Sequence, residues 1–241
     1  MQAIILAGGK GERLKSITRD IPKPIIPLGG KPFCLYQIEL LKKHGVRDII
    51  FSIGYLREKV QRLLGNGSDL GIDIHYAIED EPLGTAGAIK NSAQYLHSDA
   101  LFLVLNGDVL TDMDLSKLIE FHRSKKSFVT ISLIEAKEKK SYGSVLVNKN
   151  GRIKSFAEKV ESLQNSQFVN AGIYVFERRA LDKIPPALNY SFEKEFIPRL
   201  VRKNLPVFGF KTSCYWIDIG EPSRFKQAEK EISRLHPELR K

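Results

Sequence analysis

The chain opens with Met1-Gln-Ala-Ile-Ile-Leu-Ala-Gly-Gly-Lys-Gly-Glu-Arg-Leu14, and Pro22-Lys-Pro24 follows a few residues later. The short apolar run from Ala3 to Ala7 predicts a buried strand. It breaks into Gly8-Gly9-Lys10-Gly11, where the backbone can adopt positive φ and expose its N–H groups. Amides that converge from such a loop form a concave anion site. We therefore expect a strand and an anion-binding loop at the start of the fold.

Two basic residues follow this loop. Arg13 offers a planar donor fork that suits phosphate. Lys23 lies between Pro22 and Pro24, which stiffen its backbone and hold its ammonium group in place. Together the strand, the loop, the Arg and the Lys predict a site for a polyphosphate.

The glycines alone would be equally consistent with an ordinary turn, since a single glycine-rich loop is weak evidence. The stretch is not a GxxxxGK[ST] loop, because the closing Lys and Ser/Thr are missing. It is not GxGxxG either, because Leu14 occupies the place of the third Gly.

Composition narrows the class of protein. A chain of 241 residues with 42% hydrophobic residues fits one large α/β domain, or a domain with a small appendage. No apolar run approaches the roughly 18 residues of a membrane helix, and the start lacks the pattern of a signal peptide. Cys34 and Cys214 show no CxxC or zinc spacing, so we expect reduced thiols and a cytoplasmic protein with no membrane partner.

The net charge of +10, from 38 Lys and Arg against 28 Asp and Glu, suits anionic substrates. The basic residues are scattered, apart from Lys137, Lys139 and Lys140. Aromatic residues do not alternate with them as in an RNA-binding sheet, so we expect no nucleic-acid partner.

The first half alternates strands and helices. Strands are expected at residues 3–7, 48–54, 72–79 and 100–106, and helices at 33–44, 56–64 and 83–96. Such alternation predicts a doubly wound sheet with helices on both faces. The almost continuously apolar run 100–106 suits a central parallel strand.

The second half is richer in strands. Strands are expected at 128–135, 142–147, 153–159, 168–176, 207–210 and 215–219, and helices at 179–183, 191–203 and 222–235, with a polar tail at 236–241. Asn150-Gly151 indicates a hairpin turn. Because neither a repeat nor a linker interrupts the chain, we expect a single domain over 1–241.

Asp108 follows directly after the strand at 100–106. Open α/β sheets bind ligands at the carboxyl ends of such strands, so this carboxylate is a candidate site residue. The alternative is a turn residue before the helix that begins near Asp114.

The string LAGGKGERL followed by PKP resembles the sugar-1-phosphate nucleotidyltransferases, which make NDP-sugars. That family usually has G-x-G-[TS]-R, whereas Glu12 stands here in place of Thr or Ser. Three further pieces resemble the family in its order along the chain: Glu158-Lys159, Asn170-Ala-Gly-Ile-Tyr174 and Trp216-Ile-Asp218-Ile-Gly220. The resemblance implies a Rossmann-like, doubly wound mixed sheet of the GT-A-like type.

The resemblance also implies a set of site residues. It assigns residues 1–110 to a nucleotide-binding half, 111–225 to a sugar-phosphate-binding half and 226–241 to a C-terminal helix and tail. The implied nucleotide-binding residues are Leu6, Ala7, Gly8, Gly9, Lys10, Gly11, Glu79, Pro82, Gly84 and Thr85. The implied sugar-phosphate-binding residues are Gly143, Glu158, Lys159 and Asn170, and the implied catalytic residues are Arg13, Lys23, Asp108, Lys159 and Asp218.

In the implied reaction a sugar 1-phosphate attacks the α-phosphorus of an NTP, and pyrophosphate leaves. Asp108 and Asp218 would hold Mg²⁺, which prefers hard oxygen ligands. Because the nucleophile is already deprotonated, positioning and charge neutralisation are sufficient and no general base is required.

The substrates are less narrowly implied. The stretch Glu81-Pro-Leu-Gly-Thr-Ala-Gly87 resembles guanylyltransferases for mannose 1-phosphate and manno-heptose 1-phosphate, and Ser191-Phe-Glu193 resembles the heptose enzymes, which would serve lipopolysaccharide or capsule synthesis. Uridylyl- or thymidylyltransferases acting on glucose 1-phosphate or N-acetylmuramate 1-phosphate remain alternatives. So does a non-catalytic regulatory homologue that senses a nucleotide sugar. Whether the chain forms a homo-oligomer stays open.

Overall fold

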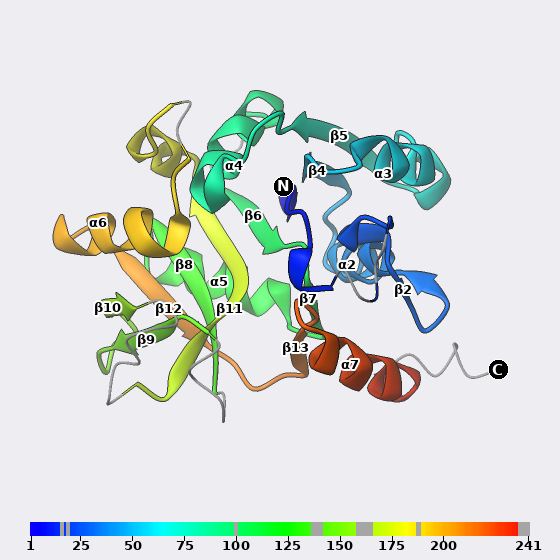
Figure 1. Cartoon of the computed structure of the whole chain (residues 1–241). Coiled ribbons are helices and arrows are strands. Elements are labelled where there is room, and N and C mark those ends of the chain that lie inside the picture. The colour runs from blue at the N-terminus through cyan, green and yellow to red at the C-terminus, as the bar shows by residue number, and fades with distance from the viewer. Residues whose placement is uncertain are drawn as a thin grey trace.

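The computed structural model describes residues 1–14, 17, 20–98, 101–135, 142–157, 166–186 and 189–235, with only the backbone of 233–235. A mixed sheet of nine strands lies at its centre, with helices on both faces (Figure 1). The predicted α/β class and doubly wound mixed sheet are confirmed.

The first half forms the parallel part of this sheet. Its strands are β1 (Gln2–Ala7), β4 (Asp48–Ile53), β5 (Asp73–Ile78) and β6 (Leu101–Asn106). They lie in the order β5-β4-β1-β6. The chain moves outward from β1 to β5 and then returns to the other side of β1. The carboxyl ends of β1 and β6 therefore flank a topological switch point, where open α/β sheets bind ligands.

Alternate residues of these strands belong to two separate cores. Ile5 packs with α2 (Phe33–Lys43), α3 (Arg57–Leu64) and α5 (Leu115–Ser124) on one face. Its neighbour Ile4 packs with α4 (Gly84–Ser92) and α6 (Ile197–Arg202) on the other. Side chains alternate between the faces of a strand, so a strand covered on both sides is apolar throughout.

The second half extends the sheet with mostly antiparallel strands. These are β8 (Val129–Glu135), β9 (Ser144–Val147), β10 (Ile153–Ala157), β11 (Phe168–Glu177) and β12 (Val207–Lys211). β11 pairs with β6 only from Ile173 onward. Its register against β8 shifts between Asn170 and Tyr174, where Gly172 has a φ of +73°. The first part of β11 therefore continues past the end of β6, beside the switch point.

A third layer joins the two ends of the chain. β7 (Val109–Thr111) pairs with β13 (Trp216–Asp218), and α7 (Pro222–Leu235) follows (Figure 1). The small pair β2 (Pro27–Leu28) and β3 (Lys31–Pro32) lies in the same layer. Their apolar side chains share one core with Leu14 and Phe225. This layer brings the C-terminal part of the chain to the turn after β6.

The predicted helix at 191–203 differs from the structure. Ser191 caps its start, because the Lys194 amide donates to the Ser191 hydroxyl at 3.1 Å. A π-helical turn at Phe192–Phe196 comes first, however, and α6 begins only at Ile197. Pro198 explains the difference, since it has no N–H to donate and its ring would clash with the carbonyl four residues earlier.

Candidate functional site

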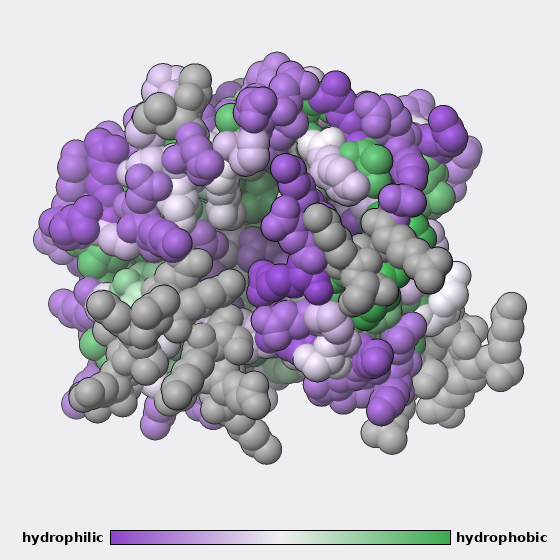
Figure 2. All heavy atoms as spheres, in the orientation of Figure 1, coloured by the Kyte–Doolittle hydropathy of each residue, from purple (hydrophilic) through white to green (hydrophobic). Residues whose placement is uncertain are grey.

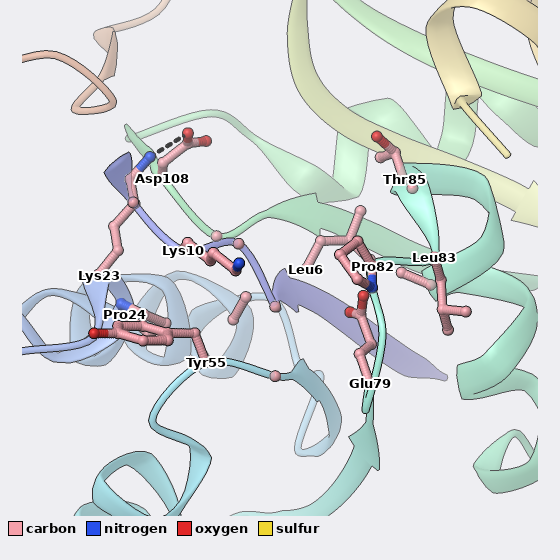
Figure 3. Close-up of a pocket in the computed structure, with 18 of the residues that line it drawn as sticks. Leu6, Lys10, Lys23, Pro24, Tyr55, Glu79, Pro82, Leu83, Thr85 and Asp108 are labelled. Atoms are coloured by element: carbon pink, nitrogen blue, oxygen red, sulfur yellow. Dashed lines mark hydrogen bonds and ion pairs between the residues drawn. The ribbon is translucent and has the colours of Figure 1, made fainter. Parts of the chain in front are cut away.

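A cleft lies at the switch point, with a volume of about 980 Å³. Hydrophilic residues border the hollow near the middle of this face (Figure 2). The following residues from the sequence-predicted set line it: Leu6, Ala7, Gly8, Gly9, Lys10, Gly11, Arg13, Lys23, Glu79, Pro82, Gly84, Thr85 and Asp108. They come from the loops after β1, β5 and β6 and from the start of α4 (Figure 3). The fold thus gathers residues spread over a hundred positions around one space.

Two glycines explain how the loop after β1 fits into the cleft. Gly11 has a φ of +61°, and the Leu14 amide donates to its carbonyl at 2.9 Å, so the chain turns sharply into the 3-10 turn at Glu12–Leu14. A Cβ added at Gly8 would collide with the carboxylate of Glu79. A side chain at Gly8 would therefore displace the end of the Glu79 side chain from this part of the cleft.

The two acids singled out in the sequence lie side by side. Asp218 pairs with Val109 across β13 and β7, and the Ile219 amide donates to the Asp108 carbonyl at 2.9 Å. A Cβ added at Gly220 would lie 2.6 Å from Asp218 Oδ1 and 3.4 Å from Asp108 Oδ2. One oxygen of each carboxylate therefore lies beside Gly220, and Asp218 Oδ1 also accepts a hydrogen bond from the Gly220 amide at 2.5 Å.

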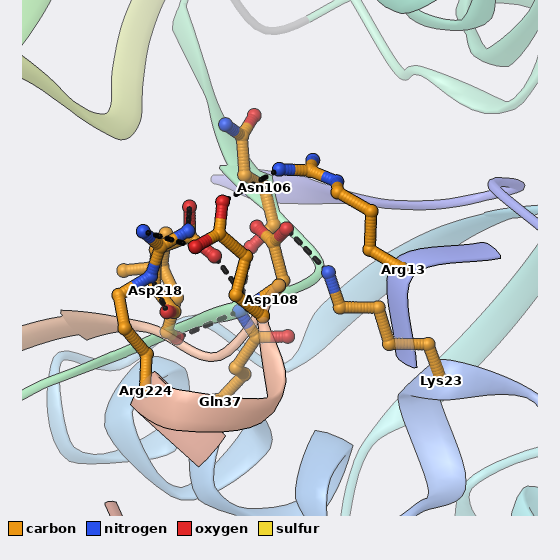
Figure 4. A network of polar contacts seen from close by, with 10 residues as sticks. Arg13, Lys23, Gln37, Asn106, Asp108, Asp218 and Arg224 are labelled. Carbon is orange, nitrogen blue, oxygen red and sulfur yellow. Dashed lines mark hydrogen bonds and ion pairs between the residues drawn. The ribbon is translucent and has the colours of Figure 1, made fainter. Parts of the chain in front are cut away.

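Cations surround this acid pair (Figure 4). Lys23 Nζ donates to Asp108 Oδ2 at 2.5 Å. Arg224 donates from Nε to the Asp218 carbonyl at 2.8 Å and lies 3.4 Å from Asp218 Oδ2. Burial, and then the charge of Asp108, raise the pKa of Asp218, while Lys23 and Arg224 oppose the rise. Two neighbouring carboxylates repel each other, so nearby positive charge, here from Lys23 and Arg224, favours their ionised forms.

Arg13 is also tied to the C-terminal part of the chain. Its Nη1 lies 3.2 Å from Glu221 Oε1, and Glu221 Oε2 lies 3.2 Å from Arg224 Nη1. Glu221 and Arg224 are not among the sequence-predicted site residues. Glu221 directly follows the Asp218-Ile-Gly220 segment, and Arg224 lies in the first turn of α7.

Glu79 places a carboxylate deep in the cleft beside Gly8 (Figure 3). Ser52 Oγ donates to its Oε1 at 2.7 Å. Burial raises the pKa of Glu79, and the hydrogen bonds from Ser52 and from the Leu83 backbone lower it only in part.

The predicted residues of the second half are only partly described. The backbone amide of Asn170 donates to the Gly143 carbonyl at 2.9 Å, and its side-chain Nδ2 donates to the Tyr174 hydroxyl at 2.8 Å. Burial raises the pKa of Tyr174 well above its usual range. Glu158 and Lys159 lie outside the described residues, as does the basic cluster Lys137, Lys139 and Lys140.

A further acid, Glu193, lines the cleft from the π-helical turn and was not predicted. Thr85 Oγ1 donates to its Oε2 at 3.3 Å. The link joins the start of α4 to the second half of the chain, and only the tertiary structure reveals it.

Within the described ranges, no three His, Cys, Asp or Glu side chains converge in a way that could hold a metal ion. Among the described residues of the predicted site, Asp108 and Asp218 form a pair beside Gly220. None of the described helices combines the length and the apolar character needed to cross a membrane.

Comparison with known proteins agrees with this architecture. The chain is 36% identical over 233 residues to D-glycero-alpha-D-manno-heptose 1-phosphate guanylyltransferase of Aneurinibacillus thermoaerophilus, covering 96% of this chain and 98% of the relative. It is 36% identical over 235 residues to mannose-1-phosphate guanylyltransferase of Mycobacterium tuberculosis. That match covers 97% of this chain but spans only 65% of the relative's length.

A solved structure is similar over almost its whole length. The crystal structure of HddC from Yersinia pseudotuberculosis complexed with GMP-PN has a TM-score of 0.81 and 35% identity, covering 96% of this chain and 99% of that chain. A family model described as nucleotidyl transferase matches residues 2–234. The chain therefore belongs to the nucleotidyl transferase family.

Proposed function

We propose that the protein transfers a nucleotidyl group from an NTP to a sugar 1-phosphate, forming an NDP-sugar. The phosphate oxygen of the sugar attacks the α-phosphorus, the bond from that phosphorus to the bridging oxygen breaks, and pyrophosphate leaves. One observation carries the proposal: the glycine loop, Arg13, Lys23 and the pair Asp108 and Asp218 meet at one switch-point cleft. Such a site is built to bring anions together.

The roles follow from charge. The amides of the Gly8–Gly11 loop and Arg13 would bind the β- and γ-phosphates and stabilise the pyrophosphate as it leaves. Lys23 would hold a nucleotide phosphate, and Lys159 the phosphate of the acceptor. Catalysis would come from positioning and charge neutralisation, because a sugar phosphate needs no base to become a nucleophile.

The residues present fit Mg²⁺. Asp108 and Asp218 each place a hard oxygen atom beside Gly220, and the charge of Asp108 contributes to the raised pKa of Asp218, an effect that a divalent cation would relieve. Mg²⁺ is commonly held by one or two carboxylates together with substrate phosphates, so the absence of a third described acid is no obstacle. Bound there, the ion would supply charge stabilisation for the phosphoryl oxygens.

Glu79 supports GTP as the nucleotide. Guanine presents two adjacent N–H donors, and a carboxylate is an acceptor that can receive both. Uracil and thymine present one N–H group between two carbonyl oxygens, and a carboxylate repels those oxygens. Ser52 and the Leu83 backbone donate hydrogen bonds to the Glu79 carboxylate but use only part of its acceptor capacity. The remaining capacity is available to a nucleobase.

The similarity to the heptose and mannose enzymes supports D-glycero-alpha-D-manno-heptose 1-phosphate or mannose 1-phosphate as the acceptor. Gly143, Asn170 and Glu158 would contact its hydroxyl groups. The product would serve synthesis of a surface polysaccharide such as lipopolysaccharide or capsule. A reaction that consumes NTP, in a protein with two free thiols, suits the cytoplasm.

A pyrophosphate-release assay tests the proposal. Each of the four NTPs is combined with mannose, manno-heptose, glucose and N-acetylmuramate 1-phosphates in the presence of Mg²⁺, and mass spectrometry identifies the product. We expect the highest kcat/KM with GTP and a manno-configured sugar. A preference for UTP or TTP would establish the uridylyl or thymidylyl alternative. Release with no pair, together with binding of a nucleotide sugar, would establish the regulatory homologue instead.

A further inference from the structure

The turn that carries Asp108 is held by hydrogen bonds at four of its backbone groups. The Gly107 amide donates to the Leu6 carbonyl at 2.9 Å, which joins the turn to β1. The Ile219 amide donates to the Asp108 carbonyl at 2.9 Å, which joins it to the C-terminal layer. The carbonyls before and after, those of Asn106 and Val109, require donors from elsewhere.

A single side chain supplies both donors. Gln37 Nε2 donates to the Asn106 carbonyl at 2.8 Å and to the Val109 carbonyl at 3.1 Å. The amide nitrogen must face this way, because the amide oxygen would repel both carbonyls. Gln37 comes from the middle of α2, seventy residues away along the chain, and spans the Gly107-Asp108 turn from beneath (Figure 4).

Gln37 is an unusual residue for its place. Its side chain is 3% exposed, among the apolar residues with which α2 packs on the sheet. No donor in the described part of the chain reaches its Oε1. Burying an amide whose oxygen has no donor costs free energy, and only the two hydrogen bonds to the Asp108 turn offset that cost.

We infer that Gln37 is a positioning residue for metal binding, an inference that rests on the proposed function. It fixes the turn from below and so keeps the Asp108 carboxylate beside that of Asp218. Mutation of a residue that orients a metal ligand without touching the metal typically lowers metal affinity or activity by about 10- to 100-fold.

Gln2 provides a matched control. It is also a buried glutamine, 2% exposed, that holds backbone groups far along the chain. Its Nε2 donates to the Tyr95 carbonyl at 3.0 Å, and its Oε1 accepts from the His97 amide at 2.5 Å. Gln2 lies at the opposite end of β1 from the cleft. Replacing either glutamine with methionine keeps the volume and removes two hydrogen bonds.

The experiment compares Gln37→Met with Gln2→Met. Mn²⁺ binding in the presence of GTP is measured by water proton relaxation, and kcat, the KM for GTP and Tm are measured alongside. We expect Gln37→Met to weaken Mn²⁺ binding and lower kcat by about 10- to 100-fold with little change in the KM for GTP. We expect both variants to lower Tm by similar amounts, because each loses two hydrogen bonds. Gln2→Met should leave metal binding and kcat unchanged. Gln37→Glu, which keeps size and polarity but cannot donate when ionised, should reproduce the metal defect if the methionine variant folds poorly.

Wild-type Mn²⁺ affinity in both Gln37 variants would overturn the inference, as would an equal loss of affinity in Gln2→Met. Turnover by a wild-type protein that binds no Mn²⁺ would also overturn it and leave the proposed reaction standing. Metal affinity that depends on Gln37, in a protein that turns over no NTP, would support the inference and refute the reaction.

Discussion

The Asp108 carboxylate forms an ion pair with Lys23 and is repelled by the neighbouring carboxylate of Asp218. Asparagine would keep its volume and remove the negative charge and one of the two oxygens of this proposed metal ligand. We expect Asp108→Asn to lower kcat at least about 100-fold, since loss of a direct ligand should exceed the loss of a residue behind it. The Lys23 pair is partly exposed, so Tm should fall by no more than about 5 °C.

Asp112→Asn is the matched control for that variant. Asp112 follows β7 and accepts a hydrogen bond from the Tyr215 amide at 2.8 Å, outside the cleft. Its kcat should stay close to that of the wild type. Near-normal turnover of Asp108→Asn with Mg²⁺ would mean that the metal is held elsewhere.

Glu79 is expected to determine the base. Glutamine at this position offers one donor and one acceptor, a pattern that suits uracil and thymine better than the paired donors of guanine. We expect Glu79→Gln to lower the ratio of kcat/KM for GTP to that for UTP by at least about 10-fold, the value of one buried hydrogen bond. Glu81→Gln, also in the cleft lining but exposed, should keep the ratio. A preference unchanged by Glu79→Gln would exclude the carboxylate as the group that selects the base.

The elements most visible in the sequence are the parallel strands, because burial on both faces makes them continuous apolar runs. The pair β7 and β13 was partly missed, since Val109–Thr111 is too short to show a pattern and is stabilised by its distant partner. The helix expected at 191–203 begins after the Ser191 cap, but its first five residues form a π-helical turn because Pro198 alters the hydrogen bonding before it. Local sequence therefore predicts an element well when the element's own periodicity, and not a partner, determines it.

The approach of β1 to the turn after β6 leads to a prediction about Gly107. A Cβ at this position would collide with the Leu6 carbonyl oxygen and come within 3.3 Å of the Ala7 Cα, and backbone atoms cannot move aside as a side chain can. We expect Gly107→Ala to destabilise the protein by about 1–3 kcal/mol, measured by urea unfolding. In Gly9→Ala the added Cβ meets nothing within 4 Å, so unfolding should be unchanged. Equal stability of the two variants would show that the strands have room to separate.

Across the whole molecule, the cleft could be predicted and much of its support could not. The residues of the glycine loop, Lys23 and Asp108 belong to motifs that can be read along the chain, and the structure brings them together. Gln37 and Glu193 act through partners 69 and 108 positions away along the chain, and nothing in the local sequence indicates those partners. Motifs identify the residues that contact a ligand. The residues that position them are recognised only in the tertiary structure.

The pH dependence of global stability depends in part on His122, which joins α5 to the sheet. Its side chain is 1% exposed, its Nδ1 lies 2.9 Å from Thr130 Oγ1, and no partner for its Nε2 occurs among the described residues. Burial, with a smaller effect of the charge on Arg123, lowers the pKa of His122 from 6.5 to about 4. Between these values the unfolded chain binds a proton that the native protein excludes, so acid favours unfolding in this range.

We therefore expect the free energy of unfolding to fall as pH drops from 6.5 toward 4, with His122 contributing up to about 3 kcal/mol of the loss. Above pH 6.5 the histidine is neutral in both states, so its contribution stays constant. Urea unfolding of the wild type and of His122→Asn at intervals from pH 4.5 to 8 measures the effect. The variant should show a shallower slope below pH 6.5 and the same slope above it, whatever its absolute stability. Identical slopes throughout would mean that the native protein admits a proton to His122, and that α5 opens from the sheet far more readily than its burial indicates.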